Sequence, residues 1–176
     1  FSADKTIACK APFTVNFTDA SPNGNQWQWD FGDGSLGNGQ TVSHTYTREG
    51  LFNVTLNLQT STGCVGSQTQ TALIKIVRPT LKVNNIPAGG CAPYSFSPQS
   101  TVTAIDGIQS YAWDFGDAGI GSGPTPTHNY LTTGKFTLKL TVTSNDGCVE
   151  TLSIPNAVRV GTPPVVDFTT IPPPPL

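Results

Sequence analysis

Histidines and aspartates recur at matching places along the chain, and these residue types could carry out catalysis or hold a metal ion. His44 and His128 are the only histidines, and each is followed two residues later by a tyrosine. A histidine could serve as a catalytic group or a metal ligand. Aspartate oxygens suit Ca²⁺, and the candidate ligands are Asp30, Asp33, Asp114 and Asp117.

The duplication itself favours a structural role for these residues. A catalytic or metal-binding histidine would hardly need a second copy in the same place, so residues that match between the copies are most simply scaffold. Two carboxylates per copy are too few for a cation that takes about six to eight oxygens. We expect the aspartates to accept hydrogen bonds from turn amides. Calcium stays as the weaker alternative, and no other cofactor is expected.

Composition excludes several other functions. The sequence contains no HExxH motif, no glycine-rich phosphate loop and no Ser-His-Asp set with a histidine of its own. A net charge of −2 without a Lys/Arg cluster argues against nucleic acid and anionic membranes. No apolar run approaches the ~18 residues needed to span a bilayer. We therefore expect a protein that is not an enzyme, binds no nucleic acid and inserts into no membrane.

The chain is a tandem repeat built around one aromatic strand. Trp29 to Gly34 returns nearly unchanged 84 positions later (113 minus 29). In both copies aromatic residues alternate, which indicates a strand with one buried face, and the Gly-Asp-Gly that follows predicts a tight turn. We expect the tryptophans to be buried in the core instead of forming a sugar-stacking platform. The scaffold motif comprises Trp29, Asp30, Phe31, Gly32, Asp33 and Gly34 in the first copy, and Trp113, Asp114, Phe115, Gly116 and Asp117 in the second.

Strand patterns fill the remainder of each copy. Apolar residues alternate from Phe52 to Leu58 and again from Phe136 to Val142. Only 11% of residues are charged, while glycine (18) and proline (15) are plentiful, which favours short strands joined by turns. The sequence predicts an all-β protein of two tandem antiparallel β-sandwiches. The expected boundaries are residues 1–78 and 79–161, followed by a proline-rich tail, 162–176, whose start is similar to the opening of a third module.

The Trp-Asp-Phe-Gly-Asp-Gly string, the downstream His-x-Tyr, the following glycine and the alternating strand together resemble the PKD domain. This resemblance covers residues 1 to about 161 and implies an immunoglobulin-like sandwich in each copy, with calcium bound in some members. The Cys-x-(Ala)-Pro and Gly-Cys elements resemble PKD arrays of large secreted or surface proteins in Bacteroidetes-type bacteria. The second copy departs from the motif at Ala118 and Pro98, which we expect to loosen a turn and shift one strand.

Four cysteines, two per copy, indicate disulfides and an oxidising, extracellular setting. One pairing joins Cys9 to Cys64 and Cys91 to Cys148, giving one bond per module. However, sandwich topology puts Cys9 and Cys64 at opposite ends of their module, and a bond needs Cα atoms within about 7 Å. A bond between Cys9 and Cys148 is the alternative, which leaves Cys64 and Cys91 for neighbouring modules or chains.

The resemblance implies a non-catalytic module of a secreted or cell-surface bacterial protein, acting as a rigid spacer, an adhesive element or a self-assembling filament element. Its expected partners are other copies of itself or neighbouring modules. The alternative is an accessory module that holds a secreted hydrolase on a polysaccharide or protein fibre. For that alternative we expect a ligand surface in the second module at Ile105, Ile108 and Ile120, whose side chains are expected to be exposed.

Overall fold

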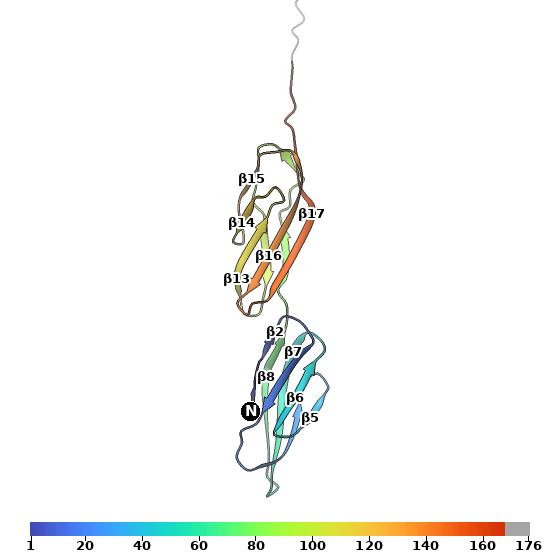
Figure 1. Ribbon diagram of the computed structural model, residues 1–176, viewed down its shortest axis with the longest axis vertical. Coiled ribbons are helices and arrows are strands. Elements are labelled where there is room, and N and C mark those ends of the chain that lie inside the picture. Colours follow the sequence, from blue (N-terminus) through green and yellow to red (C-terminus); the bar gives the residue numbers. More distant parts are fainter. Residues whose placement is uncertain (168–176) are drawn as a thin grey trace, which may run out of the picture. The chain divides into compact units, whose positions relative to one another are not determined.

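The computed structural model describes residues 1–167, and within this range the chain consists of strands joined by turns and bends (Figure 1). The predicted all-β architecture is therefore confirmed, with two immunoglobulin-like sandwiches in tandem. In the same range, none of the elements is a helix that could cross a membrane. The proline run at 172–175 lies outside the described residues.

The first sandwich consists of two sheets. The smaller has the order β1-β3-β6 and the larger β2-β8-β7-β4-β5. Neighbouring strands are antiparallel except for β2 and β8, which are parallel. The strands are β1 (Ser2–Ala3), β2 (Ile7–Ala8), β3 (Phe13–Thr18), β4 (Gly24–Asp30), β5 (Leu36–Asn38), β6 (Thr41–Tyr46), β7 (Gly50–Thr60) and β8 (Val65–Ile76).

The second sandwich repeats this topology with one strand divided. Its large sheet has the order β10-β17-β16-β13-β14, and two short pairs, β11-β15 and β12-β9, replace the small sheet. The strands are β9 (Thr80–Asn84), β10 (Gly90–Cys91), β11 (Tyr94–Phe96), β12 (Gln99–Thr103), β13 (Ile108–Asp114), β14 (Ile120–Ser122), β15 (His128–Tyr130), β16 (Gly134–Ser144) and β17 (Val149–Gly161).

The division between β11 and β12 falls at Pro98, where we expected a shift. Proline has no backbone N–H to donate to a ladder, so it interrupts the strand that is continuous as β3 in the first sandwich. The short strand expected near Leu36 is present as β5. The two-residue strands β2 and β10 were not predicted, because a pair of residues is too short to show an alternating pattern.

By its internal contacts the chain divides into two compact units. Unit 1 comprises Phe1–Leu81, Val102–Ser110 and Val142–Glu150, and unit 2 comprises Lys82–Thr101, Tyr111–Thr141 and the chain from Thr151. The module boundaries predicted from the repeat, 1–78 and 79–161, stay a prediction.

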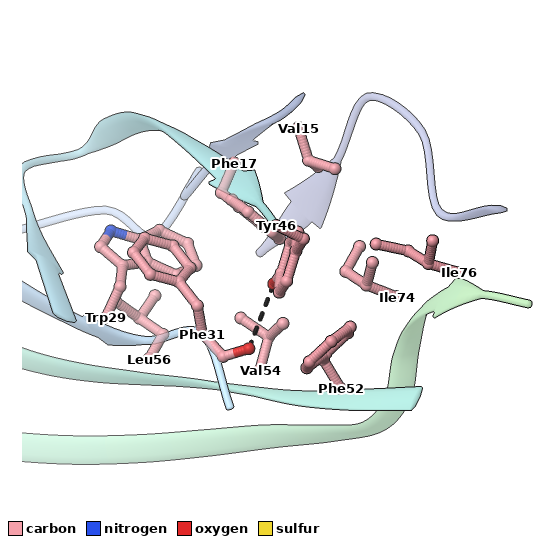
Figure 2. Close-up of a cluster of buried hydrophobic side chains, with 10 residues drawn as sticks. All are labelled: Val15, Phe17, Trp29, Phe31, Tyr46, Phe52, Val54, Leu56, Ile74 and Ile76. Atoms are coloured by element: carbon pink, nitrogen blue, oxygen red, sulfur yellow. Dashed lines mark hydrogen bonds between the residues drawn. The ribbon is translucent and has the colours of Figure 1, made fainter. Parts of the chain in front are cut away.

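A dense aromatic core fills the first sandwich between its sheets (Figure 2). Trp29 and Phe31 pack against Phe17 from the opposite sheet, with ring centroids 5.7 and 5.3 Å apart. These side chains alternate along their strands with exposed polar residues, as a strand with one buried face requires. The buried members are Val15, Phe17, Trp29, Phe31, Tyr46, Phe52, Val54, Leu56, Ile74 and Ile76.

The turn after the aromatic strand needs a left-handed residue in both copies, and the copies meet this need differently. Gly34 has a φ of +96° in the first sandwich. Ala118 occupies the matching position with a φ of +71°. A residue with a Cβ pays a steric cost in this region that glycine avoids. The second turn is therefore formed despite local strain.

This difference predicts opposite effects for two reciprocal substitutions. Gly34→Ala should lower the free energy of unfolding by ~1 kcal/mol through left-handed strain alone, because no heavy atom outside the neighbouring residues lies within 4 Å of the added Cβ. Ala118→Gly should raise it by less than ~1 kcal/mol, since glycine also stabilises the unfolded chain. Urea unfolding followed by tryptophan fluorescence measures both. Changes of the same sign would contradict this account of the turn.

Candidate functional site

In each sandwich a histidine and an aspartate form a hydrogen-bonded pair. His44 Nε2 lies 2.8 Å from Asp33 Oδ2, and His128 Nε2 lies 2.8 Å from Asp117 Oδ2. The histidine comes from β6 or β15, whereas the aspartate lies in the turn after β4 or β13. Each pair therefore connects the two sheets of its own sandwich.

Aromatic rings hold the imidazoles in place. The His44 ring stacks on Phe31 with centroids 4.1 Å apart and meets the edge of Tyr46 at 4.6 Å. The corresponding distances for His128 are 4.2 Å to Phe115 and 4.7 Å to Tyr130. The histidine side chains are 14% and 16% exposed. These histidines are thus held as parts of the packing, in the same way in both copies.

The other aspartate oxygens accept hydrogen bonds from turn amides, as the sequence predicted. Asp30 Oδ1 accepts from the Gly32 N–H and Asp33 Oδ1 from the Ser35 N–H, each at 2.9 Å. Asp114 and Asp117 repeat both bonds at 2.9 Å. Within residues 1–167 no three His, Cys, Asp or Glu side chains are grouped as a metal site. Calcium binding at the four aspartates stays a prediction.

The paired carboxylates have pKa values below the ordinary value for aspartate. Desolvation by burial raises the pKa of Asp33, but hydrogen bonds from His44 and the Ser35 amide, together with the His44 charge, outweigh it. The pKa of Asp117 is lowered by the same balance of desolvation against His128 and the Gly119 amide. Both aspartates are therefore held in the ionised form.

The tryptophans of the motif lie in the core. Trp29 is 0% and Trp113 2% exposed, and their indole N–H groups donate to the carbonyls of Gly39 and Gly123, each at 2.9 Å. Trp27 is half-buried, and its Nε1 donates to Asp19 Oδ2 at 2.9 Å. These rings do not form an open stacking platform.

The structure contains the Cys9–Cys148 disulfide, with Cα atoms 5.3 Å apart, while Cys64 and Cys91 are exposed free thiols. Cys9 follows β2, which pairs with the end of β8, whereas Cys64 precedes the first residue of β8. The strand between them is roughly 40 Å long, at about 3.3 Å per residue. The pairing of one bond per module therefore does not form in this structure.

The three isoleucines proposed as a ligand surface do not come together. Ile105 and Ile120 are exposed, but Ile108 is half-buried at the start of β13. Ile120 pairs with Asp114 at the other end of that strand, roughly 20 Å away at about 3.3 Å per residue. The expected exposure is found at Ile105 and Ile120 but not at Ile108, because Ile108 begins a strand of the large sheet. Ligand binding at these residues stays a prediction.

Sequence reasoning missed Asp19 and one groove. Asp19 is 2% exposed and accepts hydrogen bonds from Trp27 and Ser21. The groove has a volume of about 620 Å³ and lies on the large sheet of the first sandwich. Five side-chain amides line it, and we call it the amide groove: Gln26, Gln28, Asn38, Asn57 and Gln59. No motif marks these residues, although all five differ between the copies.

The paired carboxylates predict a specific loss of stability in acid. A depressed folded-state pKa adds stability above the unfolded-state value of about 3.9, and this stability is lost as the pH falls through the folded-state pKa. The double variant Asp33→Asn/Asp117→Asn should therefore be less stable at neutral pH and lose less stability below about pH 4. Thermal unfolding from pH 7 to pH 2 measures this difference. Parallel profiles for the two proteins would contradict it.

Several known proteins resemble this chain over different lengths. Human Polycystin-1 is 27% identical over 153 residues, which cover 81% of this chain and 3% of that protein. Collagenase ColA of Clostridium perfringens is 46% identical over 46 residues, which cover 26% of this chain and 4% of the collagenase. The chain thus spans only a few per cent of the length of these relatives.

Two solved structures also align with the chain. The fibronectin(III)-like modules of Clostridium thermocellum CbhA share 16% identity at a TM-score of 0.38, covering 92% of this chain and 93% of that one. The amphioxus IgVJ-C2 molecule shares 13% identity at a TM-score of 0.41, covering 85% and 98%.

The PKD domain model matches residues 2–76 and again residues 77–160. The matched ranges include both copies of the aromatic strand, the turn and the histidine. The chain therefore belongs to the PKD domain family and carries two such domains in tandem.

Proposed function

We propose that this chain is a structural module of an extracellular or cell-surface protein, acting as a spacer in a covalently linked array of like repeats. At a general level, PKD and immunoglobulin-like domains are non-catalytic modules. The duplicated aspartate–histidine pairs agree with this role, because each copy uses its ionisable residues to hold its own two sheets together. A disulfide also favours an oxidising compartment.

The main support for this proposal is the Cys9–Cys148 disulfide. Cys9 comes before the first long strand of its repeat, whereas Cys148 lies in the hairpin turn before the last strand of the next repeat. The bond therefore joins unlike positions of successive repeats. Cys91 is the counterpart of Cys9 and Cys64 the counterpart of Cys148, and these two are free and exposed.

If every opening cysteine bonds the hairpin cysteine of the next repeat, the two free thiols also have expected partners. Cys91 would bond the hairpin cysteine of a following repeat, and Cys64 the opening cysteine of a preceding one. Those repeats belong to the same array or to a second copy of this chain. A contact between unlike surfaces that does not close on itself propagates, so copies joined in this way form a filament.

The bond between copies is an ordinary oxidation. Two thiols lose two protons and two electrons and form one S–S bond, while a low-molecular-weight disulfide such as oxidised glutathione accepts the electrons and becomes two thiols. Exchange starts from a thiolate, and both free cysteines are exposed to such an oxidant.

Two single variants test the predicted direction of linkage. In oxidised glutathione, wild-type chain should form a ladder of linked species on a non-reducing gel. Cys64→Ser retains only Cys91, and Cys91→Ser retains only Cys64, so each alone should stay largely monomeric. An equimolar mixture should give a linked dimer, because it restores the unlike pair. Peptide mapping of that dimer should show Cys91 joined to Cys64.

The linkage is non-specific if each variant alone forms as much dimer as the mixture. That result would contradict the array, since exposed thiols would then be pairing by chance. Variants that lack Cys9 and Cys148 in addition serve as the control for exchange with the native bond.

A further inference from the structure

The amide groove lies across four strands of one sheet. Gln28 is paired with Asn38 on one side and with Asn57 on the other, and Asn57 is paired with Ser67. These side chains form a row across β5, β4, β7 and β8, roughly 14 Å long at about 4.8 Å between strands. A second row runs through Gln26, Gln59 and Val65. Two parallel rows of side chains, all polar except Val65, thus cross this sheet.

The rows lie on the outer face of the sheet. Trp27 and Leu58 also line the groove, but they alternate with the amides and lie on the same side as the buried Trp29 and Leu56. Four of the five amides are exposed, and Gln59 is half-buried. The side chains available to a ligand are therefore amides, with Ser67 and Val65 at the β8 edge.

The side chains of these amides are not engaged by other groups in the part of the protein that the structure describes. Each carries two N–H donors and an acceptor oxygen, and none of the five makes a side-chain hydrogen bond to another of residues 1–167. Other amides of the same sandwich are engaged. Asn53 accepts from the Ala72 N–H at 2.8 Å, and Gln70 donates to the Phe1 carbonyl at 2.9 Å.

The second sandwich builds the same sheet without any of these amides. At positions 84 residues later the five residues are Ser110, Ala112, Ser122, Thr141 and Thr143. Ser67 is likewise replaced by Thr151, whose hydroxyl lies 3.0 Å from that of Thr141, so these groups bond each other. The fold therefore does not require amides here, and the amide groove is specific to the first domain.

We propose that the amide groove binds an uncharged polysaccharide chain. No Asp, Glu, Lys or Arg lines it, so a charged ligand would find no counter-charge there. Sugar hydroxyls both donate and accept hydrogen bonds, which matches a surface of side-chain amides. Its volume is typical of ligand sites, about 300–1,000 Å³, and the row runs from the edge strand β5 across to β8, which suits a chain.

A peptide fits this surface less well than a glycan. Extended peptides are bound mainly through backbone hydrogen bonds along a sheet edge, whereas the amide rows cross β4 and β7, which have a neighbour on both sides. Peptide side chains would also need apolar pockets, and the lining offers only Val65 as an exposed apolar side chain. The proposal is independent of the spacer role, since it requires neither Cys64 nor Cys91.

Affinity electrophoresis of the whole chain tests this site. Native gels containing hydroxyethylcellulose, xyloglucan or galactomannan should retard the protein, whereas gels with polygalacturonate or chitosan should not. The double variant Gln28→Ala/Asn57→Ala should weaken retardation by about tenfold or more, since it removes two sets of hydrogen bonds. In ¹⁵N spectra, the side-chain NH₂ signals of Gln26, Gln28 and Asn57 should move when the retarding polysaccharide is added.

The matched control is Ser122→Ala/Thr141→Ala, which changes the corresponding positions of the second domain and should leave retardation unchanged. Gln28→Glu adds a charge with almost no change in shape and should also weaken binding, which separates loss of the site from loss of the fold. The proposal fails if none of the neutral polymers retards the chain, or if the double variant is retarded like wild type. It also fails if the NH₂ signals change with protein concentration alone, because the face would then pair with a second copy.

Discussion

One buried hydrogen bond in each domain holds the turn of the aromatic strand against the opposite sheet. The Tyr46 hydroxyl donates to the Phe31 carbonyl at 3.1 Å, and Tyr130 donates to Phe115 at the same distance (Figure 2 shows the first). The strand leaves its ladder at this point, so its carbonyl would otherwise be buried without a partner, at a cost of about 1–3 kcal/mol. Burial of the hydroxyl raises the pKa of Tyr46, and the negative charges of Asp33 and Asp30 raise it further, so it remains a donor.

The tyrosine hydrogen bond also explains which residue types occur around the turn. A turn fixed against the neighbouring strand leaves no room for a side chain at its first glycine, where a Cβ on Gly32 would lie 2.2 Å from the Asn53 carbonyl oxygen. A Cβ on Gly116 would likewise lie 2.6 Å from the Thr137 carbonyl oxygen. The histidine and aspartate then close the gap between the sheets. Residue types that suggest catalysis are thus accounted for by the packing of one turn.

Much of the fold was predictable because its signals are local. Alternation between Phe52 and Leu58 and the repeated hexapeptide indicate strands, turns and two copies without any knowledge of pairing. Contact between distant segments of the chain is not local, and three features depend on it. The choice of Cys148 as the partner of Cys9, the separation of Ile108 from Ile120, and the row from Asn38 to Ser67 each join residues that are distant in sequence. None of these could be derived from spacing alone.

The two domains conserve their inner faces and differ on their outer ones, and energetics explains why. A change in the aromatic core leaves a cavity that costs several kcal/mol, so both copies keep the same rings around the same bond. Exposed positions on a formed sheet usually change stability by no more than about 0.5 kcal/mol. The second domain accordingly has serine, alanine or threonine at the five positions that correspond to the amides. Since folding sets little preference there, the clustering of five amides on one sheet face calls for an explanation other than stability, and recognition of a ligand supplies one.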